Sequence, residues 1–204
     1  MTKLSADIDP SAVSIIVDQS THRPLGTGFY FLQPKFFVTA KHVVVDDQTG
    51  EIRSNLVLMQ NQPNYPQVKP IFLHPSLDLA VLEVDTPQCT VPLYPSDQRI
   101  SGHHGLQYWG YAPSLSDKNT HNYAVAVVDI PTYECEQPRE RSDGTEWTLK
   151  FDSNLSEGGH SGGPVLATGG GVVAVMIEGH AGWLRATEIR ALLQYATLDL
   201  PAIK

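Results

Sequence analysis

The stretch Glu157-Gly-Gly-His-Ser-Gly-Gly-Pro-Val165 carries the most information in this sequence. Four glycines surround a single serine, Ser161, and an apolar segment follows directly. Glycines let the backbone curl so that two N–H groups point at one spot beside a hydroxyl, where they can stabilise an oxyanion. We therefore expect Ser161 to be a nucleophile, with the N–H groups of Gly159 and Ser161 as its oxyanion hole. A glycine-rich hairpin without chemistry is the alternative.

A serine hydroxyl needs a neighbouring base to take its proton, and His42 is the candidate for that base. It follows a hydrophobic segment, Phe36–Thr39, and it alone among the eight histidines has apolar residues on both sides. Considered by itself, a histidine in such a setting is more often a core imidazole with satisfied hydrogen bonds.

Asp78 is the candidate for the acid, because an imidazole base needs a buried acceptor that fixes its tautomer. It stands immediately before an apolar strand, so its carboxylate is expected at a strand edge. Asp46 and Asp47 are nearer to His42 in sequence but fall in a polar loop, and Asp85 lies at the far end of the same strand. Alone, Asp78 would be a strand-entry residue more often than a catalyst.

Short β-rich segments separated by turn residues recur along the chain, which favours an all-β sandwich or barrel. The first series of expected strands is Ala12–Asp18, Gly26–Leu32, Phe36–Thr39, Asn55–Gln60, Gln67–His74 and Leu79–Val84. The second series is Leu106–Tyr111, Tyr123–Ile130, Glu146–Phe151, Pro164–Ala167 and Val172–Glu178. The proline-containing segment Thr86–Gly105 is expected to link the two β halves. Helical periodicity predicts one helix near the C-terminus, with Thr187 as its N-cap.

The composition excludes several classes of function. The 204 residues include 14 Lys and Arg against 22 Asp and Glu. The resulting net charge of −8 argues against nucleic acid and anionic membranes as partners. No apolar run is long enough to span a membrane, and the first residues do not resemble a signal peptide. We expect Cys89 and Cys135 to be reduced thiols in a cytoplasmic protein, and we expect no cofactor and no metal site.

The three motifs follow one another in the order His42, Asp78, Ser161. In this order and in these local contexts the sequence resembles the chymotrypsin-fold (trypsin-like) serine peptidases, and most closely their HtrA-like branch. The resemblance runs over nearly the whole chain, from about residue 12 to residue 196. The matching segments are Gly26-Thr-Gly-Phe-Tyr30 before the histidine motif, Leu77–Val84 for the aspartate motif and Gly159–Pro164 for the nucleophile loop.

The resemblance implies a single peptidase domain over residues 1–204, built from two perpendicular antiparallel β-barrels. The N-terminal barrel would take residues 12–92, the C-terminal barrel residues 105–187 and a C-terminal helix residues 188–196. It also implies hydrolysis through an acyl-enzyme, in which Ser161 attacks, His42 serves as base and then acid, and Asp78 orients His42. Activatable trypsins carry an aspartate where this chain has His160. That histidine is expected to make a hydrogen bond that stabilises the loop, with pH sensitivity as the alternative.

The resemblance places the substrate pocket at Leu155 and at Ile177-Glu178-Gly179. Leu155 stands where basic-specific trypsins carry an acid, so with Ile177 it favours a small or apolar substrate side chain. Glu178 leaves a basic preference open if it turns inward. No length remains after the expected helix for a PDZ domain, so regulation is expected from a protein partner, self-assembly or a larger parent protein. The polar segment Thr132–Thr145 is expected to be a mobile loop.

Two classes of function fit these expectations. The first is an active serine endopeptidase that cleaves a protein or peptide substrate. The second is a catalytically silent protease-fold module used for binding or scaffolding. The presence of all three side chains favours the enzyme. An esterase remains a third reading, because acyl transfer is common to both chemistries.

Overall fold

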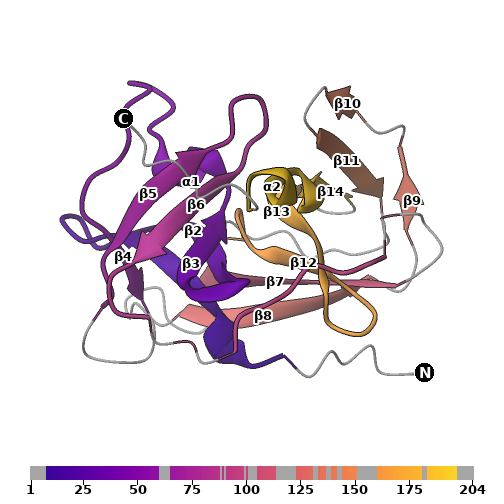
Figure 1. The fold of residues 1–204 in the computed structure, drawn as a ribbon, viewed down its shortest axis with the longest axis horizontal. Helices are drawn as coiled ribbons and strands as arrows, with labels where there is room; N and C mark the ends of the chain where they lie inside the picture. The colour runs from indigo at the N-terminus through magenta and orange to yellow at the C-terminus, as the bar shows by residue number, and fades with distance from the viewer. Residues whose placement is uncertain are drawn as a thin grey trace.

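The strands of the protein form two antiparallel sheets, one from the first part of the chain and one from the second (Figure 1). The computed structural model describes residues 8–59, 65–87, 89, 91–98, 100, 105–113, 123–130, 133–136, 139–141, 144–150, 160–180 and 183–196. The architecture is mostly β with few helices, which confirms the expected all-β fold.

The first sheet has six strands in the order β4-β1-β2-β3-β6-β5. Its strands are β1 (Val13–Asp18), β2 (Arg23–Phe31), β3 (Gln33–Thr39), β4 (Leu56–Met59), β5 (Val68–Leu73) and β6 (Ala80–Val84). A short 3₁₀ turn, η1 (Pro10–Ala12), precedes β1, and the single-turn helix α1 (Lys41–Val44) follows β3. In the register of β3 and β6, Thr39 lies opposite Ala80. The end of β3 and the start of β6 therefore lie side by side, so the residues just beyond them can meet.

The second sheet has the order β10-β11-β14-β13-β12-β7-β8, and β9 also pairs with β11. Its strands are β7 (Leu106–Pro113), β8 (Tyr123–Ile130), β9 (Glu134–Cys135), β10 (Arg139–Arg141), β11 (Gly144–Lys150), β12 (Pro164–Ala167), β13 (Val172–His180) and β14 (Trp183–Glu188). The helix α2 (Arg190–Ala196) follows β14. Strand β12 lies between β7 and β13, so the turn that enters β12 is held from both sides.

The C-terminal third departs from the sequence-based expectations in two places. The segment expected to be a loop contains β9 and β10, which pair with β11 at the sheet edge through Cys135↔Leu149 and Arg139↔Glu146. These short strands have no apolar alternation, so only the pairing defines them. Thr187 is not an N-cap, because it lies in β14 opposite Glu146 and Val175 and is fully buried. The helix therefore begins at Arg190.

One hydrophobic cluster joins the two halves of the protein. It contains residues of the first sheet, such as Phe29 and Leu82, together with Val175 and Ile177 of β13 and Leu192 of α2. The segment between the two sheets also connects them by its backbone. Leu93 N–H donates to Tyr30 O of β2 at 2.8 Å, and Ser96 N–H donates to Val172 O of β13 at 2.8 Å. The segment expected to be a linker is thus hydrogen-bonded to a strand of each sheet.

Both cysteines are free, as expected. Cys89 is buried in the cluster that joins the two halves, and Cys135 packs at the edge of a second cluster within the C-terminal sheet. In the part of the chain that the structure describes, no helix has the length and apolar character needed to cross a bilayer.

Candidate active site

His42 and Asp78 meet where the ends of β3 and β6 lie together. His42 is the second residue of α1, and the Nδ1 atom of its ring lies 2.7 Å from Oδ2 of Asp78. The other carboxylate oxygen, Oδ1, accepts the backbone N–H of His42 at 2.9 Å. The Asp78 side chain therefore binds both the ring and the backbone of His42, which fixes the orientation of the imidazole. Nε2 is left facing away from the carboxylate.

The environment shifts the pKa values of the two groups in opposite directions. Burial lowers the pKa of His42, but the hydrogen bond to Asp78 and the negative charge of Asp78 outweigh it, so the pKa lies above its ordinary value. The charge of Asp47 adds to this rise and that of Arg185 opposes it. Burial raises the pKa of Asp78, but the hydrogen bond and charge of His42 and two backbone N–H groups hold it below its ordinary value. The pair is thus suited to an ionised Asp78 that stabilises a protonated His42.

A buried histidine shapes the turn before Asp78. His74 is fully buried, and its Nδ1 accepts the backbone N–H of Leu77 at 3.1 Å. Its backbone N–H donates to Leu79 O at 2.9 Å, and its carbonyl accepts Lys41 Nζ at 2.9 Å. These bonds close the segment 74–79 into a tight turn against α1. The position of Asp78 is therefore set by its own loop as well as by His42.

Ser161 lies in a tight turn at the entrance to β12. Gly163 N–H donates to His160 O at 2.9 Å, which closes the turn with Ser161 and Gly162 at its centre. Gly162 has a φ of +89°, the conformation that a type II turn needs at its third residue and that glycine adopts without strain. Gly162 N–H donates to Met176 O of β13 at 2.7 Å, and Met176 N–H donates to Gly163 O at 2.9 Å. The serine turn is thus anchored to β13.

The segment Gly26-Thr27-Gly28 of β2 is where the serine turn meets the histidine helix. Thr27 N–H donates to Ser161 O at 2.7 Å. A Cβ on Gly26 would lie 2.8 Å from Ser161 O and 2.6 Å from Cγ2 of Val43, the residue after His42. Only a glycine therefore lets the Ser161 backbone and α1 approach β2 this closely. This contact places the backbone of Ser161, the predicted nucleophile, and the helix that carries His42 against the same segment of β2.

Thr27 also links the two sheets. Its carbonyl accepts Thr39 Oγ1 at 2.7 Å at the end of β3, and its own Oγ1 accepts the backbone N–H of Tyr111 in β7 at 2.9 Å. Thr27 is fully buried, and its bond with Thr39 is protected from water. The sequence analysis used Thr27 only as part of a motif, although a polar residue bracketed by two glycines in an apolar strand is a usable signal for a junction.

The remaining predicted site residues are placed as follows. Gly159 and Leu155 lie outside the described residues. Ile177 is 3% exposed and belongs to the hydrophobic cluster shared by both sheets. Glu178 is exposed and lies opposite Arg185 across β13 and β14, with 3.6 Å between Oε2 and Nη1. Gly179 follows it on the same strand. Their role as a substrate pocket stays a prediction.

Comparison with known protein families decides the class of the chain. Residues 26–175 match the model of the trypsin-like peptidase domain, and this range holds His42, Asp78 and Ser161. The chain belongs to the trypsin-like peptidase family. This trypsin-like peptidase is accordingly a serine peptidase by family. A search of curated proteins gave no match.

Solved structures share the fold of this trypsin-like peptidase at low sequence identity. The active form of the Rv3671c protease from M. tuberculosis aligns with a TM-score of 0.67 and 19% identity, over 95% of this chain and 82% of that one. The thermostable serine protease AL20 from an extremophilic microorganism aligns with a TM-score of 0.67 and 14% identity, over 93% and 98%. The HtrA-type protease AlgW with a tripeptide aligns with a TM-score of 0.62 and 16% identity, over 92% of this chain and 59% of that one. At these identities the likeness shows the fold alone.

Proposed function

We propose that this protein is a serine endopeptidase that hydrolyses peptide bonds through an acyl-enzyme, with His42, Asp78 and Ser161 as its catalytic residues. The observation that carries the proposal is the bidentate hold of Asp78 on His42, together with a turn that holds the Ser161 backbone against the same segment of β2 that α1 contacts. Ser161 Oγ attacks the substrate carbonyl while Nε2 of His42 takes its proton. His42 then gives that proton to the leaving amine, and a water repeats the sequence to release the acyl group.

The oxyanion formed in each half of the reaction needs two N–H donors. We assign them to Ser161 and to Gly159, on the sequence pattern around the serine. A peptide substrate is supported by the family, since AlgW, which shares the fold, was solved with a tripeptide and with a decapeptide. Glu178 faces Arg185, which reduces its availability to a basic substrate side chain and supports a small or apolar preference. A regulatory protein partner and a cytoplasmic location stay predictions.

Labelling with an organofluorophosphonate tests the proposal directly. The wild-type protein should react at Ser161, and Ser161→Ala should remove the label entirely because no nucleophile remains. His42→Ala should slow labelling strongly, since no base activates the hydroxyl. The label is located by peptide mass spectrometry on protein shown to be folded by circular dichroism.

A folded wild-type protein that does not react would favour the silent binding module over the peptidase. If the protein does react, a peptide library compared with short-chain esters separates an endopeptidase from an esterase. The same library reports the side chains accepted at the cleavage site.

The pH dependence of kcat/KM follows from the shifted pKa of His42. Only the neutral imidazole can accept the serine proton, so activity falls as the pH drops through the pKa of His42 in the free enzyme. Because that pKa lies above its ordinary value, the midpoint of the acid limb is expected above about pH 6.5. Rates measured with an uncharged ester from pH 4 to 9 give this midpoint. A midpoint below 6 would contradict the dominance of Asp78 over burial.

A further inference from the structure

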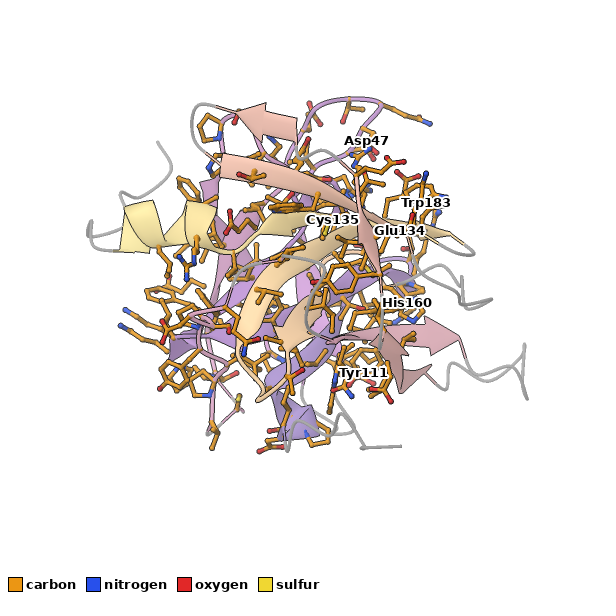
Figure 2. All side chains as sticks on the ribbon, turned by 90° about the vertical axis from the view of Figure 1, so that its right-hand side faces the viewer. Asp47, Tyr111, Glu134, Cys135, His160 and Trp183 are labelled. Atoms are coloured by element: carbon orange, nitrogen blue, oxygen red, sulfur yellow. The ribbon has the colours of Figure 1, made fainter. Side chains whose placement is uncertain are left out.

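His160, the residue directly before Ser161, fills a slot that exists because residue 110 has no side chain. His160 is only 4% exposed. A Cβ on Gly110 of β7 would lie 2.4 Å from Cδ2 of the His160 ring and 2.9 Å from both its Cα and its Cβ. Glycine inside a strand weakens the strand and often marks a place where another group approaches closely, and at Gly110 that group is His160. In Figure 2, His160 lies close to Tyr111, the residue after Gly110.

A second residue of β7 contacts the same ring. The rings of Tyr108 and His160 meet edge to face, with 5.6 Å between their centroids. Tyr108 is itself 2% exposed and lies opposite Val165 in the pairing of β7 with β12. β12 begins directly after the serine turn. The His160 ring therefore packs on β7, which is hydrogen-bonded to the strand that follows the turn.

The far end of the turn is held against the same strand. A Cβ on Gly163 would lie 2.0 Å from Trp109 O, so the turn has no room to shift toward β7 at Gly163. His160 is the first residue of the turn and Gly163 the last, and both rest on consecutive residues of β7. The orientation of the segment between them, which carries Ser161, is therefore set by how these two ends are seated.

We propose that His160 is a positioning residue: its ring, seated between Gly110 and Tyr108, fixes the turn and thereby the direction of the Ser161 hydroxyl and backbone N–H. This inference rests on the proposed function, since it assigns the ring a task in orienting the nucleophile. The close approach at Gly110 and the edge-to-face contact with Tyr108 both contribute to this seating, and both come from β7. A displacement of the reacting atoms by about 1 Å can cost about 100-fold in rate, so the loss of the ring has a measurable consequence.

The first arm of the test measures catalysis. His160→Ala is expected to lower kcat and the rate of fluorophosphonate labelling by about 100-fold, while KM changes by less than about threefold, because substrate contacts remain. Leu149→Ala is the matched control, since Leu149 is fully buried in the same cluster as Tyr108. The control should lower Tm by about 5 °C or more and leave labelling of the folded protein within about twofold. Equal effects of the two variants on labelling would overturn the proposal.

The second arm measures the seat itself and does not depend on activity. Gly110→Ala should lower Tm in the wild-type background, because the new methyl group collides with the ring. In the His160→Ala background the same substitution should lower Tm by less, because the closest collision, with the ring carbon Cδ2 at 2.4 Å, is gone and only the contacts with Cα and Cβ at 2.9 Å remain. Additive losses would show that the ring does not occupy the slot. If the wild type fails to react with the label, the proposed peptidase function falls, and this cycle still decides where the ring sits.

Discussion

Asp78→Asn is expected to lower kcat by about 10⁴-fold with little effect on folding. The reason lies in the two bonds that the carboxylate makes. Oδ1 accepts the backbone N–H of His42 at 2.9 Å, so an asparagine will keep its carbonyl oxygen there and turn its NH₂ group toward the ring. That NH₂ then donates to Nδ1, which lies 2.7 Å from the second oxygen in the native protein. The ring is forced to carry its proton on Nε2, and it can no longer accept one from Ser161.

The pH profile of this variant provides a second readout. Removing the negative charge of Asp78 removes the main causes that raise the pKa of His42, whereas burial, which lowers it, remains. The acid limb of the residual activity should therefore move to lower pH than in the wild type. Asp85→Asn is the matched control, because Asp85 is an exposed carboxylate that bonds only its neighbour Thr86 among the described hydrogen bonds of its side chain. The kcat of Asp85→Asn should stay within about twofold of the wild-type value. A kcat for Asp78→Asn within tenfold of wild type would remove Asp78 from the mechanism.

Gly162→Ala is expected to destabilise the protein by about 3 kcal/mol and to lower labelling of the folded fraction at least 100-fold. Gly162 has a φ of +89°, and a Cβ would lie 2.1 Å from Thr27 O and 2.2 Å from Thr39 Oγ1. Those two atoms are themselves hydrogen-bonded, so neither can yield. The turn must move away from β2 and lose the bond from Thr27 N–H to Ser161 O.

The control for this substitution separates backbone strain from collision. Gly169 also has a positive φ, +106°, but a Cβ there would meet nothing within 4 Å. Gly169→Ala should therefore cost only about 1–2 kcal/mol of left-handed strain, and labelling should be unchanged. Chemical denaturation and labelling kinetics measure both effects. If the two alanine variants behave alike, the contact of the serine turn with β2 has no catalytic consequence.

The sequence was a good guide to the fold because the strands are written in apolar runs with turn residues between them. Tyr123–Ile130 and Pro164–Ala167 have their expected bounds. It failed for β9, β10 and β14, whose residues are polar or mixed and are defined by pairing with β11 and β13. Thr187 shows the same limit. Its position just before a helical pattern resembled that of an N-cap, but the residue is paired with neighbouring strands within β14.

The site could be predicted only as far as chemistry is written in residue types. A serine among glycines, a histidine between apolar residues and an aspartate before a strand are visible in the sequence, and the structure joins the latter two at 2.7 Å. The supports were not visible. Gly110 matters because of what lies opposite it in space, and His74 because its ring bonds the backbone of its own turn. The role of Gly110 depends on a long-range approach, which no local pattern encodes, whereas that of His74 depends on its ring turning back onto the backbone of residues 74–79.

The shared hydrophobic cluster has a consequence for how the chain reaches its native state. The first sheet is assembled from residues before Asp85, yet Val175, Ile177, Ile189 and Leu192 are buried in the same cluster. A nascent N-terminal half leaving the ribosome would still expose the apolar surface that these late residues cover. Contacts of such large sequence separation slow folding, because a long loop must close before they form. The N-terminal half therefore depends for its full burial on residues of β13 and of the segment 189–192, which are synthesised after it.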